Sequence, residues 1–104
     1  MKVLFVCNQG QNRSKTAEVL FKDKFETRST GLYNNLLTEK DLLWADIVFV
    51  MEDFQRSEIA KRFPKMYLKK HILSLDVADI YRFEQPELIE ELNKKVNQAI
   101  LEIA

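Results

Sequence analysis

The 104-residue sequence predicts an α/β protein with an open four-stranded parallel sheet and helices on both faces. Short apolar runs typical of buried strands alternate along the chain with longer segments that carry apolar residues at helical spacing. Strands that are linked through helices favour a parallel sheet with right-handed crossovers. We therefore expect a single domain over 1–104 with the strand order 2-1-3-4, in which the winding reverses beside the first strand.

The first strand is expected at 2–6, a β-branched and aromatic run with no charge after Lys2. From Ser14 the pattern changes to that of a helix, because apolar side chains recur at helical spacing up to Phe25 with charged ones between them. The segment 7–13 therefore joins a strand to a helix. Such a junction directs backbone N–H groups and the positive end of a helix dipole at one point, which makes it an anion site.

Three further strands are expected at 26–30, 47–51 and 71–75. The first is short and alternates in polarity, which is typical of an edge strand. The second is the most apolar run in the protein, so we place it at the centre of the sheet, covered on both faces.

Three further helices are expected from the Thr38 cap to Trp44, over 52–63, and from Pro86 onwards. Asp41 lies three residues after Thr38 and completes a capping box. Pro64 ends the second of these helices. The last helix carries an apolar stripe that must lie against the sheet.

Cys7 and Arg13 add a nucleophile and a cation to the expected anion site. A cysteine that faces amide donors and a helix N-terminus is favoured as the thiolate, which is its nucleophilic form. The planar fork of Arg13 suits a bidentate grip on two phosphate oxygens, and the Ser14 hydroxyl can bond to the sulfur. The simpler interpretation, a buried Cys7 at a strand end and a solvated Arg13, is disfavoured by the spacing and by the change from strand to helix around it.

The pattern Cys7-x5-Arg13-Ser14 after a first strand, with Ala17-Glu18 in the next helix, resembles the phosphate-binding loop of the low-molecular-weight protein tyrosine phosphatases. Family members usually show Cys-x-Gly-Asn-x-Cys-Arg-Ser, followed by Pro-x-Ala-Glu. This chain departs from that pattern at Gln9, Gly10, Asn12 and Lys15, which replace the glycine, asparagine, second cysteine and proline. Gly10 can preserve the bend, because glycine and asparagine are the residues that most readily enter left-handed conformations. The resemblance implies a flavodoxin-like fold.

The later chain also resembles this family. Leu37 to Glu52 is similar to the family's middle, where a helix leads through an Ala-Asp pair into a strand that ends in Met-Asp or Met-Glu, and Ser29-Thr30-Gly31 is similar to the Ser-Ala-Gly after its second strand. The family carries its general acid as Asp-Pro-aromatic before the last helix. Asp79-Ile80-Tyr81 is the matching segment. Asp76 is the alternative acid, since it directly follows the fourth strand.

The resemblance implies a cysteine-dependent phosphatase that hydrolyses phosphate monoesters, such as phosphotyrosine or aryl phosphates, through a phosphocysteine. Cys7 would be the nucleophile, Arg13 and Ser14 would assist it, and a carboxylic acid, Asp79, would protonate the leaving oxygen. Residues expected to contact the substrate, five through their backbone amides and the last as an aromatic wall, are Asn8, Gln9, Gly10, Gln11, Asn12 and Tyr81. The partner would be a phosphorylated protein or a small phosphate ester.

The amino-acid composition argues against several other classes of partner and cofactor. The 16 basic and 16 acidic residues balance and form no basic stripe, so we expect neither nucleic acid nor a membrane surface as the main partner. One cysteine and one histidine, His71, provide no zinc-type ligand cluster, and we expect no metal or organic cofactor. The first segment is too short for a signal peptide, and no apolar run approaches membrane-spanning length, so we expect a cytoplasmic protein.

Two other classes stay open. The IIB components of sugar phosphotransferase systems are also small α/β proteins, with a cysteine after the first strand and a glycine three residues later, as Gly10 is here. Such a protein would hold a phosphocysteine and pass the phosphoryl group on. The other class is a phosphate-binding module without turnover. Arsenate reduction through an internal thiol shuttle is excluded, because it needs more than one cysteine.

Overall fold

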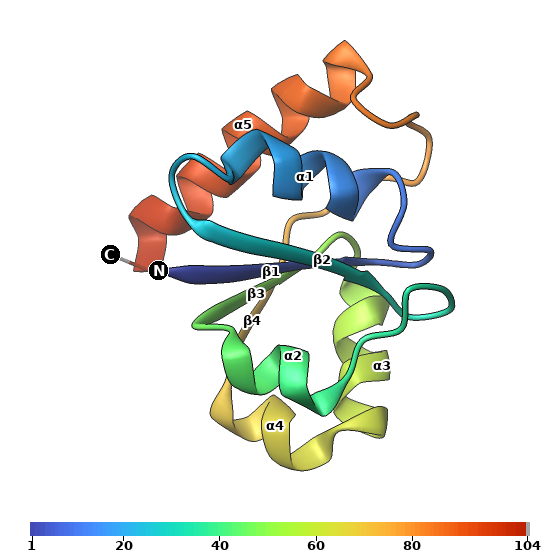
Figure 1. Ribbon diagram of the computed structural model, residues 1–104, viewed down its shortest axis with the longest axis vertical. Helices are drawn as coiled ribbons and strands as arrows, with labels where there is room; N and C mark the ends of the chain where they lie inside the picture. Colours follow the sequence, from blue (N-terminus) through green and yellow to red (C-terminus); the bar gives the residue numbers. More distant parts are fainter. Residues whose placement is uncertain (104) are drawn as a thin grey trace.

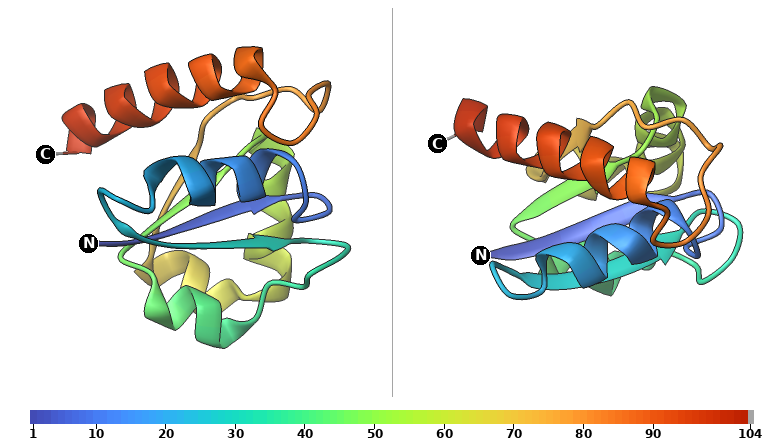
Figure 2. Two further views of the ribbon diagram at one scale, coloured as in Figure 1. Left: turned by 45° about the horizontal axis from the view of Figure 1, so that its top comes forward. Right: turned by 90° about the horizontal axis from the view of Figure 1, so that it is seen from above.

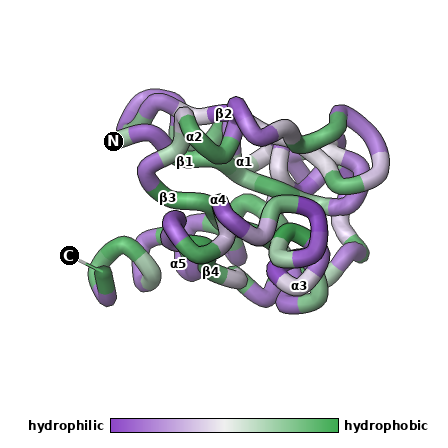
Figure 3. Tube along the Cα trace, turned by 90° about the horizontal axis from the view of Figure 1, so that it is seen from below, coloured by the Kyte–Doolittle hydropathy of each residue, from purple (hydrophilic) through white to green (hydrophobic). Residues whose placement is uncertain are grey.

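The computed structural model, which describes residues 1–103, contains a four-stranded parallel sheet in the order β2-β1-β3-β4 (Figure 1). Its strands are β1 (Lys2–Cys7), β2 (Glu26–Gly31), β3 (Ile47–Val50) and β4 (His71–Ser74). β1 pairs in parallel with β2 and β3, and β3 pairs in parallel with β4. The predicted fold class and strand order are therefore confirmed. All four residues of β3 are buried, and Figure 3 shows the apolar character of this central strand.

Five helices cover the two faces of this sheet within the described residues. They are α1 (Arg13–Phe21), α2 (Glu39–Trp44), α3 (Asp53–Arg62), α4 (Pro64–Lys69) and α5 (Pro86–Ile103). α1 and α5 lie on one face, and α2, α3 and α4 lie on the other (Figures 1 and 2). In the part of the chain described, none of the helices combines the length and apolar character that crossing a membrane requires.

The alternation of β1 divides the core between these two faces. Val3, Phe5 and Cys7 belong to the cluster under α1 and α5, whereas Leu4 and Val6 belong to the cluster above α2, α3 and α4. Cys7 is therefore the last inward-facing residue of β1 on the face where α1 begins. This placement brings its sulfur to the start of the helix that carries Arg13.

The first helix is shorter than predicted. α1 ends at Phe21, and the backbone N–H groups of both Lys24 and Phe25 donate to the Phe21 carbonyl in a closing turn. Phe25 still packs against the core cluster under α1 and α5, which explains why its spacing matched that of the helix.

The sequence pattern did not predict the helix that begins at Pro64. Pro64 ends α3, as predicted, but it is also the first residue of α4. Proline suits that position, because its fixed φ is helical and its missing N–H would have no partner there. The predicted capping box of Thr38 and Asp41 is confirmed at the start of α2.

Candidate active site

The loop between β1 and α1 curves around the Cys7 side chain. Gly10 adopts φ +66°, in the left-handed region for which glycine is suited. Its backbone N–H donates to Cys7 Sγ at 3.2 Å, and Ser14 Oγ lies 3.0 Å from the same sulfur. The sulfur is therefore contacted from the middle of the loop and from the first turn of α1.

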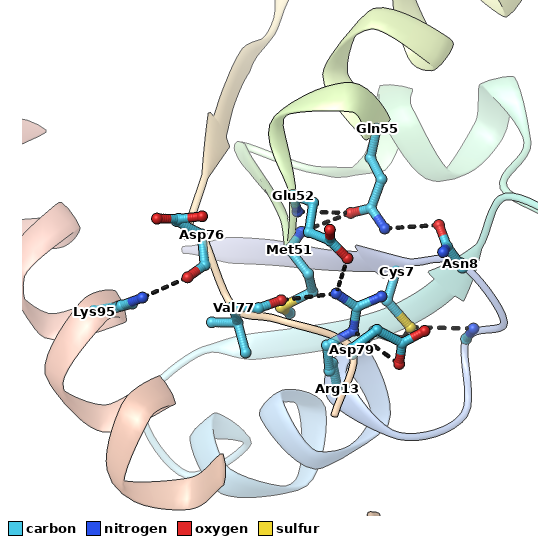
Figure 4. A network of polar contacts seen from close by, with 12 residues as sticks. Cys7, Asn8, Arg13, Met51, Glu52, Gln55, Asp76, Val77, Asp79 and Lys95 are labelled. Atoms are coloured by element: carbon cyan, nitrogen blue, oxygen red, sulfur yellow. Dashed lines mark hydrogen bonds and ion pairs between the residues drawn. The ribbon is translucent and has the colours of Figure 1, made fainter. Parts of the chain in front are cut away.

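The Arg13 side chain is 1% exposed and is fixed by two acceptors from other loops. Its Nη1 donates to Glu52 Oε1 at 2.5 Å and to the Val77 carbonyl at 2.7 Å (Figure 4). Both bonds use Nη1, so the opposite edge of the guanidinium, formed by Nε and Nη2, is the one that can grip an oxyanion bidentately. Arg13 is the first residue of α1, so its side chain starts from the helix end at which the Cys7 sulfur lies.

Asp79, rather than Asp76, lies beside the arginine. Asp79 Oδ1 is 3.7 Å from Arg13 Nε, and the Asp79 side chain is 56% exposed (Figure 4). Asp76 has a left-handed backbone, with φ +56°, and its carbonyl accepts a hydrogen bond from Lys95. Of the two candidate acids, Asp79 is therefore the one whose carboxylate shares the site with Arg13.

The segment that carries Asp79 is anchored at both ends. The Val77 N–H donates to the Met51 carbonyl at 2.7 Å, while its own carbonyl accepts from Arg13. Seven residues later, the Glu84 N–H donates to Thr16 Oγ1 on α1 at 2.9 Å. Asp79 thus lies in a span whose ends are tied to the end of β3 and to α1, although Ile80 stands where the family has proline.

The other loop residues and Tyr81 are placed less directly. The side chains of Gln9, Gln11 and Asn12 are exposed, so any contact of these residues with an anion would come through their backbone amides. Asn12 caps α1 without a side-chain hydrogen bond. Tyr81 is partly buried and packs against the core cluster under α1 and α5, which is a packing role whatever else it does.

Two residues of the site were not found from the sequence. Glu52 forms the ion pair with Arg13, and Gln55 Nε2 donates to Asn8 Oδ1 at 2.9 Å. Gln55 Oε1 in turn accepts from the backbone N–H groups of Met51 and Glu52, so this amide ties the loop after β1 to the start of α3. The Met-Glu pair at the end of the third strand was the one signal for Glu52.

Within residues 1–103, no group of three or more His, Cys, Asp or Glu side chains has the arrangement of a metal site. The charges that surround Cys7 and Arg13 are the carboxylates of Glu52 and Asp79. The bend between β1 and α1 thus brings the Cys7 sulfur and the buried Arg13 guanidinium together, and the part-exposed carboxylate of Asp79 approaches Arg13 from the segment before α5.

No protein-family model and no curated protein matches this sequence. Solved structures, however, match over nearly the whole chain. A low-molecular-weight protein tyrosine phosphatase from T. tengcongensis has a TM-score of 0.82 and 23% identity, with 98% of this chain and 99% of that chain covered. A mutant of YwlE from Bacillus subtilis has a TM-score of 0.78 and 21% identity, with 99% and 98% covered. The tyrosine phosphatase Wzb from Escherichia coli K30, in complex with phosphate, has a TM-score of 0.73 and 14% identity, with 99% and 98% covered.

At these identities the similarity establishes the fold. The chain has the α/β fold of the low-molecular-weight phosphatases, a group of structures that includes tyrosine phosphatases and arginine phosphatases. The family resemblance expected from the loop sequence is confirmed at the level of the fold.

Proposed function

We propose that this protein is a cysteine-dependent phosphatase that hydrolyses phosphate monoesters, with phosphotyrosine or other aryl phosphates as the preferred class. The observation that carries the proposal is the convergence of three groups on one bend. The Gly10 N–H and the Ser14 hydroxyl contact Cys7 Sγ, the Arg13 guanidinium is fixed at the same helix end, and Asp79 lies 3.7 Å from it. The similarity of the fold to those of solved tyrosine phosphatases supports the same proposal.

In the first chemical step the substrate phosphate lies on the amides of 8–13 and on the Nε and Nη2 edge of Arg13. The Cys7 thiolate attacks phosphorus, so that an S–P bond forms as the ester P–O bond breaks. Negative charge on the equatorial oxygens meets donors that are already in position, which is commonly the largest catalytic contribution. Glu52 and Val77 hold Arg13 for this role, because they fix its Nη1.

Asp79 completes both half-reactions. As an acid it donates its proton to the departing oxygen, which leaves as an alcohol or phenol. As a base it then takes a proton from the water that attacks the phosphocysteine. The S–P bond breaks, inorganic phosphate is released, and the thiolate and the protonated Asp79 are restored. The 56% exposure of the Asp79 side chain supports this assignment, because both a substrate and water could reach the carboxylate.

The test compares hydrolysis of phenyl phosphate and p-nitrophenyl phosphate by the parent chain and by the variants Cys7→Ser, Asp79→Asn and Asp76→Asn. We expect Cys7→Ser to abolish turnover. Asp79→Asn should slow phenyl phosphate hydrolysis by about 10²- to 10⁴-fold, and p-nitrophenyl phosphate less, because its leaving group needs less protonation. Asp76→Asn is the matched control and should behave as the parent.

Several outcomes would contradict the proposal. Activity that survives Cys7→Ser would exclude a phosphocysteine. A stable phosphocysteine without release of phosphate would identify a phosphoryl carrier, and phosphate binding without turnover would identify a binding module. Because some similar structures are arginine phosphatases, the substrate series includes phosphotyrosine and phosphoarginine. Faster release of phosphate from phosphoarginine would overturn the preference for aryl phosphates while leaving the chemistry of Cys7 intact.

A further inference from the structure

We propose that Asn35, from the loop between β2 and α2, is a positioning residue that fixes the phosphate-binding loop from its outer side. The inference rests on the proposed phosphatase function, since its subject is the orientation of the amides that would hold the phosphate. Asn35 is 25 residues away from the loop in sequence, but its side-chain amide contacts two consecutive carbonyls of that loop. Nδ2 donates to the Gly10 carbonyl at 3.2 Å and to the Gln9 carbonyl at 3.4 Å.

These two bonds control which way the loop amides point. The Gln9 carbonyl belongs to the same peptide unit as the Gly10 N–H, and in a planar trans peptide the two groups point in opposite directions. Asn35 holds the carbonyl on one side, and the N–H on the other side donates to Cys7 Sγ at 3.2 Å. Rotation of this peptide would therefore break both contacts together.

The next peptide unit is held in the same way. The Gly10 carbonyl also accepts from Asn35 Nδ2, so the Gln11 N–H of that unit points away from Asn35. Two successive N–H groups that point to the same side form a small concave anion site. One side-chain amide, with its two hydrogens, thus sets the direction of both donors.

Asn35 is itself held in place against the loop. Its backbone adopts φ +48°, and its carbonyl accepts from the Gly31 N–H at 2.9 Å. The backbone N–H groups of Leu32 and Tyr33 donate to the carbonyls of Cys7 and Asn8. The loop after β2 and the phosphate-binding loop therefore form one hydrogen-bonded unit.

This arrangement also accounts for Gly10. Glycine has no side chain with which to fix the peptides on either side of it. A Cβ on Gly10 would lie 3.0 Å from the Asn35 Cβ and 2.9 Å from the Gly31 nitrogen, so the space beside Gly10 is already filled. We infer that this chain supplies a fixing amide from another loop.

The test measures how inorganic phosphate protects Cys7 from alkylation by iodoacetamide, which needs a reactive sulfur but no turnover. The variants are Asn35→Gly and Asn35→Asp, both of which tolerate a left-handed backbone. Asn34→Gly is the control, because it places a glycine in the same exposed loop but leaves the Asn35 amide intact. Thermal unfolding confirms that each variant is folded at the assay temperature.

In Asn35→Gly, we expect the phosphate concentration that gives half-protection to be about three- to tenfold higher than in the parent. A change of this size corresponds to the loss of one or two ordinary hydrogen bonds. Asn35→Asp should need at least about tenfold more, because its carboxylate lacks a donor and would face two carbonyl oxygens. Asn34→Gly should match the parent. Turnover of phenyl phosphate should fall with phosphate affinity in both Asn35 variants.

Parent-like protection and kcat in both folded Asn35 variants would overturn the inference and leave the proposed function standing. If the parent chain does not hydrolyse phosphate esters but its protection by phosphate still depends on Asn35, the proposed function is overturned and the inference is supported. A parent chain whose Cys7 is not protected by phosphate at any concentration would overturn both.

Discussion

A guanidinium that is only 1% exposed needs a nearby negative charge, and in this protein Glu52 provides it. The carboxylate meets Arg13 Nη1 at 2.5 Å and is itself 32% exposed. Burial of a cation without such a partner would cost several kcal/mol. Glu52 also precedes α3 directly, and its backbone is tied to that helix: its N–H donates to Gln55 Oε1, and its carbonyl accepts from the Gln55 N–H, both at 3.0 Å.

Glu52→Gln tests this dependence, since glutamine keeps an acceptor oxygen but removes the charge. We expect the free energy of unfolding to fall by about 1–3 kcal/mol, in the range for hydrogen bonds to charged groups. Because Arg13 would also lose its fixed direction, kcat/KM for phenyl phosphate should fall about tenfold or more. Chemical denaturation and steady-state kinetics measure the two effects.

Asp53→Asn is the control for Glu52→Gln, because Asp53 is the next residue, is 82% exposed and pairs with Arg56 at the surface. It should change neither stability nor kcat/KM by a measurable amount. Equal effects of the two substitutions would show that the charge of Glu52 does not act through Arg13.

At the residue scale, the sequence was sufficient to predict which groups meet when these groups are close together along the chain. Cys7, Arg13 and Ser14 lie within eight positions, and the change from strand to helix between them indicated the bend. Glu52 and Gln55 reach the loop from 39 and 47 residues away. Their contacts depend on the order of the strands and on side-chain geometry, which no local spacing encodes.

At the scale of elements, the close approach of two loops determines the shape of the site. The end of β2 contacts the loop between β1 and α1 at Gly31, where there is no room for a side chain. A Cβ there would lie 2.2 Å from the Asn34 carbonyl oxygen and 2.6 Å from the Gly10 nitrogen. The two backbones must separate to accommodate even one methyl group.

Gly31→Ala should therefore affect both stability and anion binding. We expect a loss of about 1–3 kcal/mol in the free energy of unfolding, as is usual for overpacking of a filled site. Displacement of the Gly10 nitrogen should also weaken phosphate binding. Ser29→Ala, two residues earlier in β2, should change the stability by less than about 0.5 kcal/mol. Wild-type phosphate affinity in Gly31→Ala would contradict the coupling between the two loops.

The elements themselves were largely predictable, because each strand is an apolar run or an alternating one between polar segments. The errors arose where one residue could serve two purposes. Pro64 both ends α3 and begins α4, and a proline alone indicates only the first of these. Phe25 fitted the spacing of the first helix but packs against the core from the turn that follows it.

At the scale of the whole molecule, the site depends on the core under α1 and α5. Phe5 stacks between Phe21 of α1 and Phe49 of β3, with ring centroids 6.0 Å and 5.8 Å away. These contacts join the helix that carries Arg13 to the strand whose end leads to Glu52. The core thus fixes the distance between α1, which carries Arg13, and the end of β3, which leads to Glu52.

Phe5→Ala should cost about 3–5 kcal/mol of unfolding free energy, the usual result for removing a buried aromatic ring. This is a large part of the total stability of about 5–15 kcal/mol that is typical of such domains. Leu101→Ala, at a position that is 78% exposed on α5, should leave the midpoint of urea denaturation unchanged. A similar loss for both variants would argue against a core centred on Phe5.

The measurement that tests the central claim most directly is a crystal structure of the chain grown with millimolar phosphate. We predict a phosphate ion within the bend, with Cys7 Sγ facing its phosphorus, the 8–13 amides around its oxygens and the Nε and Nη2 edge of Arg13 on two of them. The Asp79 carboxylate should lie beside the phosphate oxygen that points away from Cys7 Sγ. Phosphate bound elsewhere, or an empty bend in which Arg13 keeps only its contacts to Glu52, Val77 and Asp79, would contradict the account.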